Sequence, residues 1–396
     1  MSVAMSTDFM HQALRTRVIA RPGAVGELGV ELARLGCERP LLLSGQRTAN
    51  GPVWEDVKQA LGGMSYWSVQ DIEAHSSLQT VDRVASLARA EHVDALVVVG
   101  GGSVSDTAKA VALVLAEGAP LARHASRFVP PFTVLTPDLF KPKLPIFSIA
   151  MTASGAEATP SLGIRTTEGT KLLFWDAQLA SRVIFLDPLA NLATPASVML
   201  STGMNGLAHC LEGLYSKAKS PITSILALDG LVRFDQALRQ VADAPTDMHA
   251  RANLLLAAHI SGMVLASARS CLHHALCHVI GAAFGVAHGD VNSAVLPHAL
   301  RFNAPAAVDE LGAAAVRLGL PAPPGNDAGR AGEPLVHWLE ELQQAIGVPR
   351  HLRDLGIARD QLADVAQKTM HERGLAYNPR QVNSPSELEA LLLAAW

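Results

Sequence analysis

VVVGGGSVSDTAKA, residues 97–110, is the most informative stretch of the first half of the chain. It begins as an apolar run typical of a buried strand, passes through three glycines and continues as a helix pattern. Glycines let a backbone approach a ligand closely, and a helix N-terminus offers free N–H groups to a phosphate. Ser103 and Asp106 have the three-residue spacing of a helix cap. The stretch predicts either a phosphate-binding turn or a tight turn without a ligand.

Other apolar runs place this turn in a parallel sheet. They are TRVIA at 16–20, PLLLS at 40–44, SYWSV at 65–69, PIFSIAM at 145–151 and RVIFLD at 182–187, and helical patterns separate them. Alternation of this kind is typical of a sheet of about six strands wrapped by helices. The proline-dense segment from Phe128 to Pro145 is expected to be a loop.

After Asp187-Pro188 the pattern becomes helical throughout. Thr194-Pro195 is expected to cap one helix, and the sequence from Ser384 to Glu387 is expected to form a capping box at the last one. Since a chain of 396 residues exceeds a single core, we expect two domains. These are an α/β dinucleotide-binding domain over residues 1–190 and an all-helical domain over residues 191–396.

Composition limits the partners. Hydrophobic residues make up 49% of the chain and charged residues 17%, and the net charge is −4, without a clustered basic face for a nucleic acid. Four cysteines without C-x-x-C spacing indicate a reducing compartment. The N-terminus does not resemble a signal peptide, and the apolar window Leu254–Ala268 is short for a membrane span. We expect a cytoplasmic protein with a small-molecule partner.

Histidines in the second half are grouped at helical spacings. Asn205 and His209 are four residues apart, as are His274 and His278, and His288 follows in a His-Gly pair. Residues four apart share a helix face. The two faces and His288 could surround one ion, although histidines on apolar helices can also simply pack.

Three motifs resemble the iron-containing alcohol dehydrogenase superfamily. GGGSVSDTAK resembles its GGGSxxDxAK signature, MTASGAE at 151–157 is similar to its TTxGTGSE segment, and HALCHVIGAAFGVAHG reproduces its HxxxHxxGxxxxxxHG pattern. The resemblance implies a Rossmann-like domain followed by a helical one, the architecture of dehydroquinate synthases. It implies a nicotinamide cofactor bound by a set of loop residues: Gly100, Gly101, Gly102, Ser103, Asp106, Lys109, Thr152 and Ser154.

The end of the second strand bears on cofactor choice. An acidic residue there bonds the ribose 2′-OH of NAD, and an arginine favours the 2′-phosphate of NADP. This chain has Ser44 and Gly45 in place of an acid and Arg47 nearby. We therefore expect Ser44 at the cofactor site and NADP(H) to be accepted as well as NAD(H).

The resemblance also implies catalytic and metal-binding positions. The family's metal ligands fall on His209, His274, His288 and Asn205, and His278 falls beside the nicotinamide as a proton donor. Asn205 is a neutral amide where the metal enzymes have a carboxylate, which weakens the site for Fe²⁺. Zn²⁺ held by the three histidines stays an alternative.

Several strings resemble the maleylacetate reductase branch, described as working without metal and commonly carrying Asn in this position: STGMNGLAHCLEGLYS, LHHALCHVIGAAF, VLPHALRFN and NPRQV. They imply reduction of an oxo-enoate or related carbonyl compound in the degradation of aromatic compounds, by a homodimer. A basic side chain must then face the dicarboxylate, and Arg165, Lys171, Lys217 and His273 are the candidates. Two features depart from that branch: the segment at 128–145 is longer than the connection in the reductases, and His288-Gly289-Asp290 resembles the metal dehydrogenases.

Three other functions stay open. A metal-dependent alcohol dehydrogenase would use Fe²⁺ or Zn²⁺ to polarise a carbonyl group. A dehydroquinate synthase-like enzyme would eliminate and cyclise without net consumption of NAD(P)H. A non-enzymatic nucleotide-binding module would bind NADPH without turnover.

Overall fold

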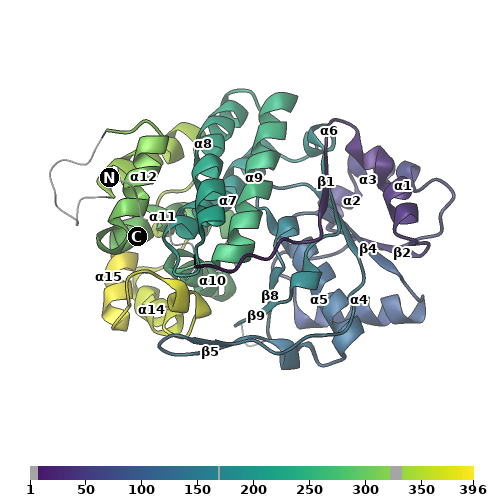
Figure 1. Ribbon diagram of the computed structural model, residues 1–396, viewed down its shortest axis with the longest axis horizontal. Helices are drawn as coiled ribbons and strands as arrows, with labels where there is room; N and C mark the ends of the chain where they lie inside the picture. The colour runs from purple at the N-terminus through teal and green to yellow at the C-terminus, as the bar shows by residue number, and fades with distance from the viewer. Residues whose placement is uncertain (1–7, 168–169, 322–331) are drawn as a thin grey trace.

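The structure is a computed structural model that describes residues 8–167, 170–321 and 332–396. Figure 1 shows two halves side by side: an α/β half built from the first part of the chain and a helical half built from the rest. This confirms the predicted fold class of a Rossmann-like sheet followed by a helical region. The division at residue 190 itself stays a prediction.

Six parallel strands form the sheet, in the order β1-β10-β7-β4-β2-β3. Their bounds are β1 Arg17–Ala20, β2 Pro40–Ser44, β3 Trp67–Val69, β4 Ala95–Gly100, β7 Ile146–Ala150 and β10 Val183–Leu186. Leu41 and Leu43 pack into the core on one face, whereas Leu42 packs into the core on the other. Burial on both faces explains why the strand sequences are unbroken apolar runs.

Helices cover both faces of the sheet and connect its strands. They are η1 Ala24–Glu27, α1 Leu28–Arg34, α2 Gln46–Ala49, α3 Pro52–Leu61, α4 Leu78–Ala90, α5 Gly102–Glu117, η2 Leu121–His124, η3 Ala156–Ala158, η4 Ala177–Leu179 and α6 Pro188–Asn191. From β2 the chain continues to β3 at one edge of the sheet, and from β4 it continues to β7 on the side of the other edge. The point between β2 and β4 is therefore the topological switch point, where ligands bind in open α/β sheets.

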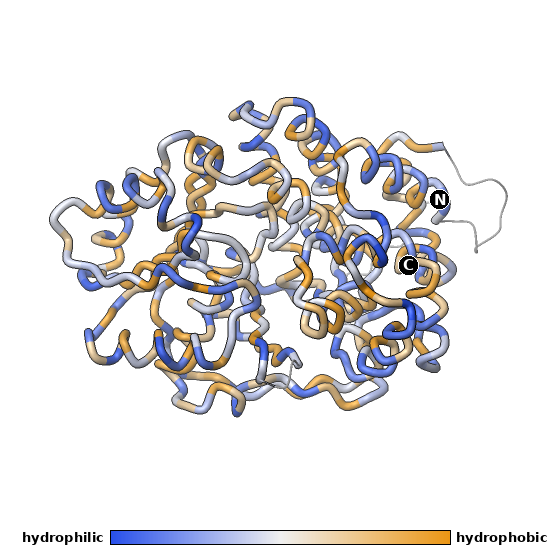
Figure 2. Tube along the Cα trace, turned by 180° about the vertical axis from the view of Figure 1, so that it is seen from behind, coloured by the Kyte–Doolittle hydropathy of each residue, from blue (hydrophilic) through white to orange (hydrophobic). Residues whose placement is uncertain are grey.

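Two antiparallel hairpins extend from the α/β half toward the helical half. The first pairs β5 Arg127–Val129 with β6 Thr133–Leu135, and the second pairs β8 Ser161–Arg165 with β9 Lys171–Trp175. The segment predicted as a proline-dense loop thus contains most of the first hairpin. It crosses the lower edge of the molecule in Figures 1 and 2. At its tip, Lys217 of the helical half lies 5.1 Å from the centre of the Phe132 ring.

The helical half contains no strand among the described residues after β10, as predicted. Its helices are α7 Ala196–Tyr215, α8 Pro221–Asp243, α9 Met248–Ala268, α10 Leu272–Phe284, α11 His288–Asn303, η5 Ala304–Ala306, α12 Val308–Arg317, α13 Glu333–Ile346, η7 Leu352–Leu355, η8 Arg359–Gln361, α14 Leu362–Thr369, η9 Arg373–Tyr377 and α15 Pro385–Ala395. Helices α7, α8 and α9 pack on one another and share a core with β10.

One described helix, α9, is long and apolar enough by length and composition to cross a membrane. In the structure 61% of its most apolar window is buried, largely against α7 and α8. Burial of this kind is what a core helix requires, and this agrees with the expectation of a buried helix over Leu254–Ala268.

Two predicted helix-capping interactions are wrong. Thr194 does not cap α7, because its hydroxyl donates to the carbonyl of Met151 and Pro195 itself is the N-cap residue. Ser384 is the N-cap residue of α15, as predicted, but the capping box is absent: the Ser384 hydroxyl pairs with the Ser386 hydroxyl, and Glu387 accepts from the amide of Asn383. Thr194 is diverted by a backbone carbonyl outside the helix and Ser384 by a neighbouring hydroxyl, and such local partners compete with capping.

Candidate active site

The glycine turn joins β4 to α5 at the switch point of the sheet. Gly101 is the N-cap residue of α5, and a Cβ atom there would lie 2.6 Å from Thr152 Cγ2. Only glycine therefore lets the turn lie this close to the loop after β7. The free N–H groups of the 16-residue helix α5 point out of this turn.

The predicted cap formed by Ser103 and Asp106 is absent. The Ser103 hydroxyl accepts from the amide of His75 at 3.2 Å, and the Asp106 carboxylate accepts from the amide of Gly163 at 3.1 Å. These side chains tie the glycine turn to the loop after β3 and to the hairpin β8–β9. They hold the loops that line the cleft and do not cap the N-terminus of α5.

Three adjoining cavities make one cleft from the sheet to the helical half. The first, of about 260 Å³, is lined by Arg47, Gly100, Gly101 and Thr152. The second, of about 540 Å³, shares Gly101 and Thr152 with the first and continues past Gly102, Ser103 and Ser154 to Asn205 and His288. The third, of about 180 Å³, shares Ser154, Asn205 and His288 with the second and adds His209, His274 and His278. The candidate cofactor loop and the histidines thus face one continuous space.

Two cofactor candidates are placed behind the surface of this cleft. Ser44 is fully buried, and its hydroxyl donates to the carbonyl of Val99 at 3.0 Å. Lys109 is also fully buried, and its ammonium group donates to the carbonyls of Ala156 and Ser161 at 2.7 and 3.0 Å. In this arrangement both side chains hold the loops that line the cleft.

The histidines converge as the spacing predicted. His209 lies on α7, His274 and His278 lie one turn apart on α10, and His288 begins α11. The ring centre of His274 is 4.7 Å from that of His209, 6.2 Å from that of His278 and 6.0 Å from that of His288. Residues up to 79 positions apart in sequence thus form a single cluster at the floor of the cleft.

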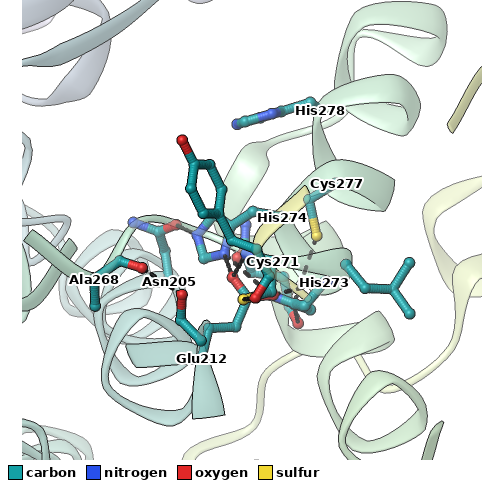
Figure 3. A network of polar contacts seen from close by, with 12 residues as sticks. Asn205, Glu212, Ala268, Cys271, His273, His274, Cys277 and His278 are labelled. Atoms are coloured by element: carbon teal, nitrogen blue, oxygen red, sulfur yellow. Dashed lines mark hydrogen bonds and ion pairs between the residues drawn. The ribbon is translucent and has the colours of Figure 1, made fainter. Parts of the chain in front are cut away.

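A buried carboxylate that the sequence analysis missed organises this cluster. Glu212 accepts hydrogen bonds from the amides of Cys271 and His273 at 2.9 and 2.8 Å, and its Oε2 lies 2.7 Å from His274 Nδ1. It is fully buried and lies below His274 in Figure 3. Burial alone would raise the pKa of Glu212, but the neighbouring His274 and these donors lower it. The carboxylate therefore fixes a proton on His274 Nδ1.

Asn205 occupies the other side of His274. Its amide nitrogen donates to the carbonyl of Ser154 at 3.3 Å, which turns its Oδ1 toward His274 Nε2 at 3.2 Å. Figure 3 shows the amide beside the imidazole ring. Because Oδ1 is an acceptor, this contact is a hydrogen bond only when Nε2 donates.

These contacts do not fit a tightly held metal ion. The side chain that lies 3.2 Å from His274 Nε2 is the neutral amide of Asn205, and an amide oxygen binds a divalent ion less tightly than a carboxylate does. Among the described residues, one group of three His, Cys, Asp or Glu side chains has its ligand atoms within 4.8 Å of one another, and it consists of Glu212, His273 and His274. Within this group His274 Nδ1 already lies 2.7 Å from Glu212 Oε2 and 3.4 Å from His273 Nδ1.

Burial governs the charge of the remaining histidines. It lowers the pKa of His209, His278 and His288 well below the usual value for histidine; the neighbouring histidines lower it further, as does Lys171 for His278 and His288. These three rings are neutral at pH 7. His273 is fully buried, its Nε2 lies 3.0 Å from the carbonyl of Asn292, and burial lowers its pKa to about 4. It has a structural role here and does not face a substrate.

Glu372 is a second carboxylate that the sequence analysis missed. Its Oε2 lies 3.5 Å from His278 Nδ1 and is buried without a hydrogen-bond partner. Burial raises the pKa of Glu372 to about 7. The pair can therefore hold a proton beside the cleft at neutral pH.

Basic side chains also line the third cavity. Lys171, one of the four candidates from the sequence, lies there with Arg269 and Arg373, which the sequence analysis did not single out. Lys217 instead lies over Phe132, outside this set. No local motif marks Arg269 or Arg373, because each follows an ordinary helical stretch.

The chain matches two family models over most of its length. They are "Iron-containing alcohol dehydrogenase" over residues 15–188 and "Fe-containing alcohol dehydrogenase family, C-terminal" over residues 199–396. The chain belongs to the iron-containing alcohol dehydrogenase family and is an oxidoreductase.

Its curated relatives narrow this class. Maleylacetate reductase 2 of Cupriavidus pinatubonensis is 32% identical over 98% of this chain and 97% of its own length. Maleylacetate reductase of Pseudomonas knackmussii is 28% identical over 97% of both chains. The chain is thus a maleylacetate reductase-like oxidoreductase.

Solved structures with this fold include a maleylacetate reductase and an alcohol-type oxidoreductase. Maleylacetate reductase from Agrobacterium tumefaciens has a TM-score of 0.80 and 26% identity, with 99% of each chain covered. A 1,3-propanediol oxidoreductase has a TM-score of 0.89 and 26% identity, with 98% of this chain and 100% of that chain covered.

Proposed function

We propose that this chain reduces the carbon–carbon double bond of an oxo-enedioate of the maleylacetate class, using NADH or NADPH and no metal ion. The observation that carries the proposal is the cleft that runs from the glycine turn to the histidines, where Asn205 engages His274. The similar curated proteins are maleylacetate reductases, so their substrate is maleylacetate.

The residues present fit a nicotinamide cofactor. Gly101, Gly102 and Ser103 at the start of α5, with Thr152 and Ser154 opposite, would hold its diphosphate. The cavity beyond them contains Arg47 and Thr48 and no acidic residue among those that line it, which supports acceptance of NADPH. A bound reduced nicotinamide supplies the hydride that adds to the electrophilic alkene carbon.

Residues of the helical half then handle charge and protons. Hydride addition leaves an electron pair that spreads onto the carbonyl oxygen as an enolate, and Lys171 beside the histidines stabilises that negative charge. Neutral His278 passes a proton from one ring nitrogen to the adjacent carbon as its Nδ1 takes a proton from Glu372, so that no imidazolate forms and the saturated product is completed. Glu372, with its pKa of about 7, replaces that proton on His278.

Glu212 and Asn205 act as positioning residues. Glu212 fixes the tautomer of His274 from below, and Asn205 links the same ring to the carbonyl of Ser154 on the cofactor loop. The hydrogen-bond chain joins the two sides of the cleft.

A substrate panel tests the proposal. NADPH and NADH oxidation would be followed with maleylacetate, with a saturated ketone and with an aldehyde, and the products identified by mass spectrometry. We expect kcat/KM for maleylacetate to exceed that of the neutral carbonyls by roughly 100-fold or more, because they lack the charged groups that the site recognises. The product should be the saturated oxo-dicarboxylate.

The same panel tests a second candidate, a metal-dependent alcohol dehydrogenase, which the similarity to 1,3-propanediol oxidoreductase favours. Aldehydes reduced to alcohols as fast as maleylacetate is consumed would support that function and contradict ours. Conversion without net consumption of NAD(P)H would indicate dehydroquinate synthase-like chemistry, and thermal stabilisation by NADPH without turnover would indicate a binding module.

A further inference from the structure

Two arginines face the third cavity, and neither forms a close ion pair with a described residue. Arg269 is the C-cap residue of α9 and Arg373 is the first residue of η9, so the helical half supplies both. Neither guanidinium group forms a hydrogen bond or ion pair with a described residue. Most guanidinium groups elsewhere in the structure pair with a carboxylate or a carbonyl oxygen.

The two charges lie near each other. Burial, and then the positive charge of Arg269, lower the pKa of Arg373 to about 10. Both side chains are therefore charged at neutral pH. Two adjacent cations that are partly buried and unpaired are unfavourable by themselves, and an anion entering the cavity would relieve both the desolvation and the repulsion.

The backbone holds Arg269 in an unusual conformation. Its φ angle is 64° and its ψ angle 170°, a region that only glycine adopts readily. The guanidinium carbon lies 4.2 Å from the centre of the Trp175 ring, across the boundary between the two halves. A strained non-glycine residue whose side chain is held by an aromatic ring points to a role for that side chain in the cavity.

Lys171 also lines this cavity, and the local backbone leaves room for its side chain. A Cβ atom at Gly163 would lie 2.1 Å from Lys171 Cε, so the absence of a side chain at Gly163 makes room for the lysine. Lys171 also lines the second cavity, beside the glycine turn, whereas Arg269 and Arg373 line the end away from that turn. The arginines are thus placed for the substrate and not for the cofactor diphosphate.

We infer that Arg269 and Arg373 bind the carboxylate of the substrate that is remote from the reacting carbons. Guanidinium groups bind carboxylates through paired N–H donors, which fixes orientation as well as position. This assignment rests on the proposed reduction of a dicarboxylate and names the residues that select it.

The test compares Arg373→Met and Arg269→Gly with the wild-type protein, using maleylacetate and its monomethyl ester at the remote carboxyl group. We expect each variant to raise KM for maleylacetate roughly 30-fold or more, since a buried charged contact is lost. KM for NADPH should stay within twofold. KM for the monoester should be the same in the variants and the wild type.

Arg269→Gly separates recognition from folding. Glycine suits this backbone conformation, so the thermal midpoint of the variant should equal or exceed that of the wild type while KM rises. As a matched control, Arg301→Met removes an arginine of α11 that is paired with Glu340 at the surface, and it should leave KM unchanged. An unchanged KM for maleylacetate in both cavity variants would overturn the inference.

A binding measurement keeps this outcome distinct from failure of the proposed function. Titration calorimetry would measure binding of the saturated oxo-dicarboxylate product to the NADP⁺-loaded protein. If the wild type binds this ligand and Arg373→Met does not, the arginines recognise the carboxylate even where maleylacetate is not reduced. Equal binding by the two proteins would contradict the role of Arg373.

Discussion

At the scale of single residues, the site depends on side chains whose partners decide what they do. The sequence placed Asn205, His209, His274, His278 and His288 together, and helical spacing alone was enough for the two pairs on α7 and α10. It did not predict Glu212, because nothing in its surroundings on α7 distinguishes a carboxylate beneath a histidine from one on a helix surface. The hydrogen bonds to Cys271 and His273 become visible only when α10 is packed against α7.

Asn205→Asp should create a metal site. The substitution restores a negative ligand beside the histidines and removes the amide that donates to Ser154. We expect the variant, purified with added Zn²⁺ or Fe²⁺, to retain about one ion per chain after gel filtration, as measured by elemental analysis. The wild-type protein treated identically should retain far less, and equal metal content in both would contradict the role given to Asn205.

His278→Gln should reduce kcat for maleylacetate by roughly 10²- to 10⁴-fold, the usual contribution of a positioned acid. KM for NADPH should change little, because the side chain faces the substrate end of the cleft. His298→Gln is the matched control, since His298 lies on α11 in a separate surface groove. Full activity of His278→Gln would remove His278 from the mechanism.

Glu372→Gln should change how stability depends on pH. The folded protein holds the pKa of Glu372 at about 7, raised from 4.5 by burial. The contribution of Glu372 to the free energy of unfolding is therefore most favourable below about pH 4.5. It falls by about 3 kcal/mol in total as the pH rises toward 7. Glutamine does not ionise, so the variant should exceed the wild type in free energy of unfolding by more at pH 8 than at pH 5, as measured by denaturant unfolding. If the difference in free energy of unfolding is the same at both pH values, Glu372 does not titrate between them.

At the scale of elements, the cleft depends on how closely loops and helices approach one another. The strand–glycine–helix pattern predicted the turn after β4 correctly, since apolar runs and glycines are local signals. Helix caps were predicted less well. Serine and threonine are common N-cap residues, but Ser103 and Thr194 form their side-chain hydrogen bonds with distant segments of the chain. The hydroxyl of Ser384 accepts no backbone N–H of its helix.

Gly101→Ala should weaken cofactor binding without unfolding the protein. Its new methyl group would lie 2.6 Å from Thr152 Cγ2 and would push apart the two loops that line the cleft. We expect KM for NADPH to rise about tenfold, which corresponds to ~1.4 kcal/mol. Gly26→Ala is the control, because a methyl group at Gly26 meets no atom within 4 Å. Equal NADPH kinetics for the two variants would show that the turn does not contact the cofactor.

At the scale of the whole molecule, the site lies where the two halves meet. The sheet contributes the glycine turn, the hairpin β8–β9 contributes Lys171, and the helical half contributes the histidines with Arg269 and Arg373. Sequence patterns gave the class of each half, because periodicity is local. They could not give the arginines, which become neighbours only when the end of α9 and the start of η9 fold against the same cavity. The segment at 128–145 was predicted as a loop, and its hairpin also depends on contacts with the helical half.

The most direct test of the metal-free mechanism is one paired measurement on protein purified without chelators. Fe and Zn content would be determined by elemental analysis, and maleylacetate-dependent NADPH oxidation would be measured before and after EDTA on the same sample. We expect far less than one ion per chain and unchanged turnover, because the side chain beside His274 Nε2 is the neutral amide of Asn205 and not a carboxylate. About one ion per chain, with activity lost to EDTA and restored by Fe²⁺ or Zn²⁺, would contradict this account.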